Sequence, residues 1–355
     1  MSQTAALFLD AYRDLNARKM FWIVLIISTL VAASFALVGL TPTGFSILAY
    51  DFPSPLFNRR LISPAAFYKL IFLNLGIDWW LTVFATCLAL ISTASLFPDF
   101  LAGGAVDLYL SKPISRLRLF LTKYVCGLLF VALQIACFCL ASFLVIGLRG
   151  NAWEPGLFLA IPIVVLFYSY LYCLCVLIGV ATRSTVAAIL LTLLFWVGVF
   201  AVHTTEVALL MFKLDEERTL ASLDHKVAAA QAALHQASAT APSTRQATLQ
   251  SRLQEAQEKR ADFHFKFDRP HRLFYLVKSV LPKTSETVLL LQRQLIRRAD
   301  LPQESSPRSD RGNHMAAALQ DELRRRGWPW IVGTSVAFEC VVLTIAAMIF
   351  CWRDY

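Results

Sequence analysis

Long runs of apolar residues, each about long enough to cross a lipid bilayer as a helix, dominate this chain. A helix rises 1.5 Å per residue, so roughly 20 apolar residues span the hydrocarbon core. Six runs reach this length, at residues 21–40, 79–97, 125–148, 157–182, 185–202 and 330–352. The first five contain no charged residue, and the only one in the sixth is Glu339. The pattern predicts six transmembrane helices.

The stretch between the fifth and sixth runs, residues 206–328, is rich in charged residues. Apolar residues recur in it at alternating steps of three and four, which is the spacing of a coiled-coil seam. The two seams consist of Leu220, Leu223, Val227, Ala230 and Leu234, and of Leu249, Leu253, Ala256 and Phe263. A Ser- and Pro-containing segment at 238–244 separates them, which predicts an antiparallel hairpin over about 214–267. Its role stays open between a solvated insertion that packs on itself and a docking arm for a partner.

Three less apolar stretches predict helices at the membrane surface. Residues 5–20 have the pattern of an amphipathic helix on the inner surface, and 65–77 that of an interfacial helix in an outer loop. Residues 271–296, interrupted by Pro282, are too polar to span and are expected to lie in the outer interface or dip into it. The predicted organisation is therefore 1–205 with five spans, 206–328 as an extracytoplasmic insertion, and 329–355 with the sixth span and a cytoplasmic tail.

Composition and charge agree with an all-α polytopic membrane protein. The chain is 57% hydrophobic and 16% charged, whereas soluble domains are about 45–50% apolar and about 25% charged. All eight Cys residues fall inside the predicted spans and fit as small hydrophobic side chains, which argues against a disulfide scaffold. No His or Cys spacing indicates a metal site, and no cofactor is expected.

The distribution of Lys and Arg predicts the orientation in the cell (inner) membrane. With a cytoplasmic N-terminus, the short inner segments carry nine of these residues and the short outer segments four. The positive-inside rule then predicts that both termini are cytoplasmic. The net charge of +9 is expected to reflect such anchors and contacts with anionic lipid, and no nucleic-acid partner is expected.

The most informative segment is 97–124, FPDFLAGGAVDLYLSKPISRLRLFLTKY, on the inner side between the second and third spans. Its short amphipathic run contains Asp107, and the segment is hinged at Gly103, Gly104 and Pro113 before a new helix begins. These features indicate a cytoplasmic helix lying across the inner surface. Without further evidence, an ordinary positively charged inner loop explains the segment as well.

This segment resembles the corresponding loop of type-2 ABC export permeases, in particular the subgroup containing the permease of the nitrous-oxide-reductase maturation transporter. The matching positions are Gly104, the leucine-rich residues 108–110, Pro113, Ser115, Arg116 and Lys123. The six-span layout, the inner N-terminal helix, the turn at 182–185 and the C-terminal residues 350–354 are similar as well. The resemblance covers 5–203 and 330–355, but it does not cover the insertion.

The resemblance implies a permease subunit that works as a homodimer or pseudo-dimer with two cytoplasmic ATPase subunits. The sequence contains no G-x-x-x-x-G-K-[ST] phosphate loop, so ATP hydrolysis must come from a separate polypeptide. Contact with that ATPase is expected in the coupling segment 98–118. The residues expected to make it are Gly103, Gly104, Asp107, Ser111, Lys112, Pro113, Ser115 and Arg116.

Two other functions stay open, and an enzyme is not expected. The chain could be a membrane scaffold that transports nothing and recruits a partner through its coiled-coil insertion. A secondary transporter is disfavoured because Glu339 is the only ionisable residue deep in a span. The other strongly polar intramembrane residue is Gln134. We expect Glu339 either to pair with a polar group such as Gln134 or Thr192, or to face a cavity and contact cargo.

Overall fold

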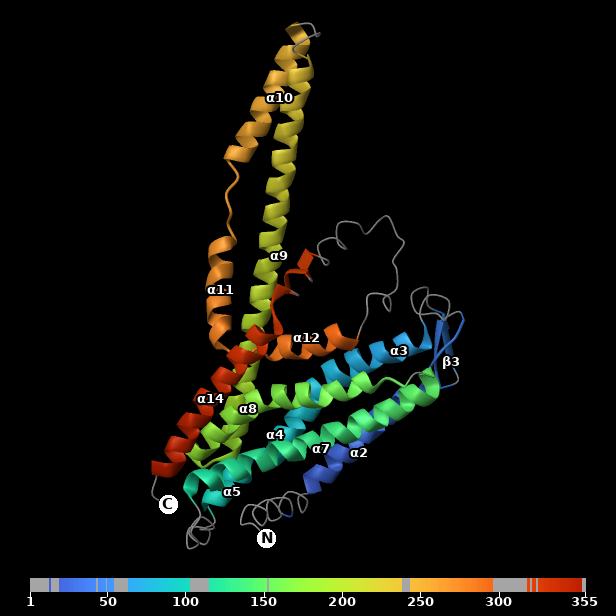
Figure 1. Cartoon of the computed structure of the whole chain (residues 1–355), viewed down its shortest axis with the longest axis vertical. Helices are drawn as coiled ribbons and strands as arrows, with labels where there is room; N and C mark the ends of the chain where they lie inside the picture. The colour runs from blue at the N-terminus through green and yellow to red at the C-terminus, as the bar shows by residue number, and fades with distance from the viewer. Residues whose placement is uncertain are drawn as a thin grey trace. The chain divides into compact units, whose positions relative to one another are not determined.

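The computed structural model describes most of the chain. The described residues are 13, 19–42, 44–48, 50–53, 63–102, 115–151, 153–237, 243–295, 318–319, 321–323 and 325–352. They divide into two compact units, each described separately below. Unit 1 comprises Met1–Phe200, Val280–Ser305 and Trp328–Tyr355, and unit 2 comprises Ala201–Ser279 and Ser306–Gly327. Both units are mainly helical (Figure 1).

Five helices in the described residues are long and apolar enough to cross a membrane. They are Pro64–Leu101, α7 (Arg116–Gly150), Pro155–Thr182 with α8 (Ala160–Thr182), α9 (Thr185–Ala237) and α14 (Trp328–Trp352). Each contains one of the last five predicted runs. The first run forms α2 (Lys19–Ser34) and the 3₁₀ turn η1 (Phe35–Leu37), and this apolar helix is shorter than the other five.

The first run ends early because its last residues form a strand. A three-stranded antiparallel sheet consists of β1 (Val38–Leu40), β2 (Gly44–Ile47) and β3 (Tyr50–Pro53), in the order β1-β2-β3. Phe45 of β2 lies opposite Phe52 of β3, and their rings stack with centroids 5.6 Å apart. The hydrophobic pattern, which predicted a membrane span up to residue 40 and a loop after it, did not indicate this sheet.

The predicted interfacial helix at 65–77 is wrong as a separate element. Ser63 caps a helix start, with its Oγ accepting a hydrogen bond from the backbone N–H of Ala66 at 3.2 Å, and Pro64 occupies the first turn. The chain then runs through α3 (Pro64–Ile71), the π-helix η2 (Phe72–Ala85), α4 (Thr86–Ala94) and α5 (Leu96–Ala102). A π-helix of this length is unusual, since π segments are mostly single turns at functional sites.

Helix α8 forms the centre of unit 1, packed against α7, α12 (Thr284–Leu295) and α14 (Figure 1). Its side chains Tyr168, Tyr170 and Tyr172 are almost fully buried. The predicted break at Pro282 is confirmed, because α11 (Asp268–Val280) ends before it and α12 begins after it. Helix α12 buries Leu291 in the core of unit 1.

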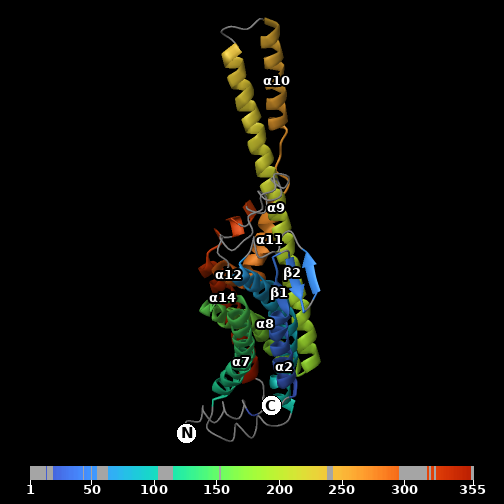
Figure 2. The ribbon, with the colours of Figure 1, turned by 90° about the vertical axis from the view of Figure 1, so that its right-hand side faces the viewer.

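Unit 2 contains the remainder of α9 beside the antiparallel helix α10 (Ser243–Ala261), as both views show (Figures 1 and 2). Asp224 of α9 forms an ion pair with Arg260 of α10. The Glu216 carboxylate accepts hydrogen bonds from the backbone N–H groups of Lys266 and Phe267, at 3.0 and 3.3 Å. The predicted seam residues of both helices are partly covered. Coiled-coil packing of the two helices stays a prediction.

Candidate functional site

Most of the predicted coupling segment lies outside the described residues. This holds for Gly103, Gly104, Asp107, Ser111, Lys112 and Pro113. Ser115 and Arg116 are described. Ser115 has extended backbone angles and caps α7, with its Oγ accepting a hydrogen bond from the backbone N–H of Arg118 at 3.4 Å. This cap sets the start of α7 at Arg116.

Arg116 joins the start of α7 to the end of α14. Its Nη1 donates a hydrogen bond to the backbone carbonyl of Cys351 at 3.1 Å. The last carbonyls of a helix have no partner within the helix and carry partial negative charge, so a guanidinium is a favourable partner for them. Arg116, the second residue after the segment 103–114, is thus bonded to the end of α14.

Aromatic packing strengthens this junction between α5, α7 and α14. The ring of Phe120 lies 5.2 Å from Phe97 and 5.6 Å from Phe350, measured between centroids. The Nζ atom of Lys123 lies 5.1 Å from the centroid of Phe100, and the lysine side chain is buried. A cation over an aromatic face contributes roughly 0.5–2 kcal/mol. The two helices that border the segment 103–114 and helix α14 therefore pack as one cluster.

Glu339 lies where α7, α8 and α14 meet. Its Oε1 accepts a hydrogen bond from the hydroxyl of Tyr124 on α7, and its Oε2 accepts one from the hydroxyl of Ser169 on α8, both at 2.8 Å. The expected partners Gln134 and Thr192 were wrong, but a polar partner on a neighbouring helix is present. Two O–H donors reduce the cost of placing a carboxyl group in an apolar helix bundle.

Stacked tyrosines continue from the Glu339 group through the interior of unit 1. The ring of Tyr124 stacks on Tyr172 with centroids 5.1 Å apart, and Tyr172 stacks on Tyr168 at 5.6 Å. The hydroxyl of Tyr168 is hydrogen-bonded to that of Thr93 on α4 at 2.6 Å. The run Tyr168-Ser-Tyr-Leu-Tyr172 was the signal for this feature in the sequence, and the hydrophobic pattern alone overlooked it.

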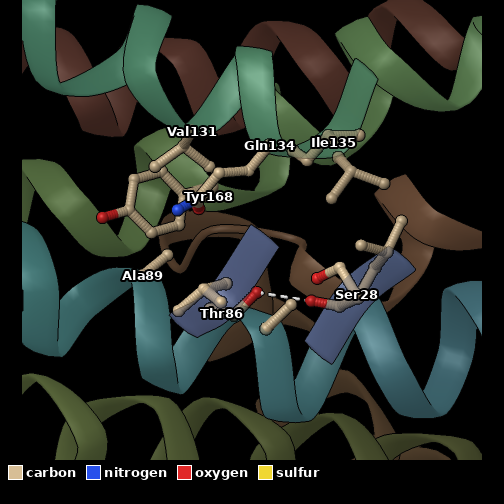
Figure 3. Close-up of a pocket in the computed structure, with 11 residues that line it drawn as sticks. Ser28, Thr86, Ala89, Val131, Gln134, Ile135 and Tyr168 are labelled. Carbon is tan, nitrogen blue, oxygen red and sulfur yellow. Dashed lines mark hydrogen bonds between the residues drawn. The ribbon is translucent and has the colours of Figure 1, made fainter. Parts of the chain in front are cut away.

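Gln134 lies in a separate place, at a small cavity between α2, η2, α4, α7 and α8. Figure 3 shows Gln134 and Tyr168 on one side of this cavity, with Ser28 and Thr86 on the other. Gln134 is buried, and its Nε2 has no hydrogen-bond partner among the described residues. The Thr86 hydroxyl donates to the carbonyl of Leu81 at 2.8 Å, where the π-helix changes to α-helix. The cavity is therefore mixed, with polar groups among apolar walls.

The chemistry of these groups suits adjustable contacts between helices. The carboxyl group of Glu339 is bonded to two hydroxyls, and one hydroxyl can be exchanged for another donor without leaving an unpaired cation in the bundle. In the part of the chain that the structure describes, no three His, Cys, Asp or Glu side chains are grouped to hold a metal ion.

Neither a protein-family model nor a curated protein matches the chain. The resemblance to type-2 ABC permeases therefore stays an expectation from the sequence.

Proposed function

We propose that this chain is the membrane-spanning permease subunit of an ABC exporter and works with a separate ATPase subunit. The permease is a homodimer or pseudo-dimer in the cell membrane, and α2 supplies the sixth span, with both termini in the cytoplasm. The observation that carries the proposal is the family pattern in 97–124. The five long apolar helices support it, because they agree with a polytopic membrane protein.

The contacts at the ends of the coupling segment suggest how the movement is transmitted. When ATP closes the ATPase subunits, the segment 98–118 moves with the ATPase surface. Arg116 transmits this movement to the end of α14 through its bond with the Cys351 carbonyl, and the Phe97, Phe120 and Phe350 cluster transmits it between α5, α7 and α14. Helices α7 and α14 also contribute Tyr124 and Glu339, so movement at the inner end alters the polar group inside the bundle.

A scaffold that recruits a partner is the second candidate function. The observation that favours it is the exposed helical pair of α9 and α10, held by the Asp224–Arg260 ion pair. The two functions make different demands on the inner side of the membrane. A permease requires an ABC ATPase, whereas a scaffold does not. A gene for an ABC ATPase beside the gene of this chain is the cheapest observation that separates them.

The direct test is to purify the chain with its neighbouring ATPase and to measure ATP hydrolysis in proteoliposomes. Arg116→Glu, which places a carboxylate against the Cys351 carbonyl, should reduce the stimulation of ATP hydrolysis while the complex still assembles. Lys19→Glu is the matched control, because it makes the same charge reversal at an exposed cation of α2, outside the coupling segment 98–118. Normal stimulation in Arg116→Glu would contradict the coupling role. Failure of any ABC ATPase to copurify would favour the scaffold.

A further inference from the structure

Helix α11 in unit 2 buries a lysine and exposes an apolar face, unlike an ordinary amphipathic helix of a soluble protein. Lys278 is buried, with 4% of its surface exposed. Leu273, Leu276 and Val277 are 64%, 57% and 52% exposed. These three residues are spaced three and four apart, so they form one face of the helix. A soluble amphipathic helix turns such a face toward the core.

A buried charge cluster fixes this orientation of α11. The side chain of Glu206 on α9 is fully buried, and its Oε2 accepts a hydrogen bond from Lys278 Nζ at 2.8 Å. The guanidinium of Arg326 also binds this carboxylate, and His271 Nε2 lies 3.5 Å from Glu206 Oε1. Removing a partner from a buried ion pair is costly, so the cluster holds the side of α11 that carries His271 and Lys278 inward. The face of Leu273, Leu276 and Val277 is consequently held outward.

The neighbouring part of α9 also exposes apolar side chains. Met211 and Phe212 are 40% and 54% exposed. In the sequence, α9 is apolar from Thr185 to Phe212, except for the polar residues 203–206, and becomes highly charged after Lys213. At 1.5 Å per residue this stretch is about 42 Å long, which matches a bilayer of about 40–45 Å including its headgroup regions. Charges turned inward and paired with one another are the arrangement found within membranes.

We infer that the surface formed by Met211, Phe212, Leu273, Leu276 and Val277, the leucine face, is seated in the lipid bilayer, in the headgroup region of the leaflet where α9 leaves the membrane. Arg269 and Arg272 are exposed and lie one turn before Leu273 and Leu276, which places their cations beside the apolar face. Basic side chains in this position bind the phosphates of anionic lipids. The inference does not depend on the transport function, since a scaffold could be anchored in the same way.

Photocrosslinking in the native membrane tests this inference. The photoreactive residue p-benzoylphenylalanine replaces Leu276 in one variant and Leu273 in a second, in the full chain, and the purified products are analysed by mass spectrometry. Gln254 on α10 is the matched control, because it is an exposed position of a helix in the same unit. We expect phospholipid adducts at Leu276 and Leu273 and none at Gln254.

Crosslinks from the leucine face to another protein or to a second copy of the chain would overturn the inference. The absence of lipid adducts in folded, monodisperse protein would do so as well. As a further test, the double variant Arg269→Gln/Arg272→Gln is placed in nanodiscs of phosphatidylcholine with or without phosphatidylglycerol. Anionic lipid should increase the adduct yield at Leu276 when Arg269 and Arg272 are present. In the double variant, anionic lipid should leave the yield unchanged. An equal increase in both would refute the assigned role of the two arginines.

Discussion

Replacement of Glu206 by Gln should increase local opening of α11 in unit 2, although the new side chain has almost the same shape as the old one. Glu206 is fully buried and is the carboxylate that both Lys278 and Arg326 bind. The amide introduced by Glu206→Gln has almost the same volume as the carboxylate but carries no charge, so two buried cations lose their counter-charge. Breaking a buried pair by removing one partner costs about 3–5 kcal/mol. Because about 1.36 kcal/mol is a factor of ten, the local opening equilibrium should increase by roughly two to four orders of magnitude.

Hydrogen exchange measured by mass spectrometry is the appropriate assay, because it reports local opening of α11 while the rest of the protein stays folded. Peptides that cover α11 should exchange faster in Glu206→Gln by about the factor given above, as long as exchange reports the opening equilibrium. Peptides from α8, in unit 1, should not change.

Glu255→Gln is the matched control. Glu255 also forms an ion pair, with Lys259, but both side chains are about two-thirds exposed. Exposed pairs contribute little to stability, so this variant should exchange like the parent chain. If Glu206→Gln leaves the exchange of α11 unchanged, the charge cluster does not hold the helix, and the argument for the outward leucine face loses its physical basis.

Three further outcomes are expected. Glu339→Leu should lower the Tm of the detergent-solubilised protein, because the Tyr124 hydroxyl loses its nearest acceptor at a cost of about 1–3 kcal/mol, while the Ser169 hydroxyl keeps the Leu166 carbonyl at 2.9 Å. Glu339→Gln should lower the Tm less. Loss of transport in Glu339→Gln, with Tm and ATP hydrolysis intact, would instead place Glu339 in contact with cargo. Burial keeps the pKa of His271 below its usual value of 6.5, although Glu206 opposes the shift. Acidification below pH 6.5 should therefore destabilise unit 2 until His271 is protonated. His271→Gln should remove this pH dependence in hydrogen-exchange titrations. A cysteine at Ser243 should react with an impermeant thiol reagent in intact cells, and labelling only after permeabilisation would place α10 in the cytoplasm.

The pH prediction follows from the charges around His271. Glu206 and Lys213 on α9 and Arg326 face it, and Asp268 lies three residues before it on its own helix. A proton on His271 would add a further cation beside Lys278 and Arg326 at a single carboxylate. The folded state therefore disfavours the protonated form, and its stability falls as the pH falls through the window between the two pKa values. Exchange of α11 that is independent of pH after correction for intrinsic rates would contradict this reasoning.

The long helices could be predicted from the sequence because the length of an apolar run is local information. The error at 65–77 arose at Asp78, where a charged residue was taken as the end of the outer loop. In the structure the Asp78 Oδ2 accepts a hydrogen bond from Gln292 Nε2 on α12 at 2.8 Å. That partner is 214 residues away in the sequence, and it allows the helix to continue past the charge. The sheet was missed for a similar reason, since β1 is stabilised by pairing with β2 rather than by its own pattern.

The contacts of the candidate site also depend on residues that are distant in the sequence. Glu339 was identifiable because a single carboxylate in an apolar run has to be compensated. Tyr124 and Ser169, its partners, are ordinary residues in their own helices, and only the packing of α7, α8 and α14 brings them to Glu339. In the same way, the role of Glu206 depends on Lys278 and Arg326, which are 72 and 120 residues distant.

The two buried carboxylates differ in how they are compensated, and this difference limits what each can do. Glu206 is bound by cations, so separating them leaves uncompensated buried charge at a cost of several kcal/mol. Such a cluster fixes three segments of unit 2 and resists movement. Glu339 is bound by two hydroxyls, each of which can be exchanged for another donor or lost at about 1–3 kcal/mol. A bundle that changes its packing in a transport cycle requires contacts that exchange at low cost, like those of Glu339. The movement proposed for a permease is therefore assigned to α7, α8 and α14, and the inferred static anchoring to α11.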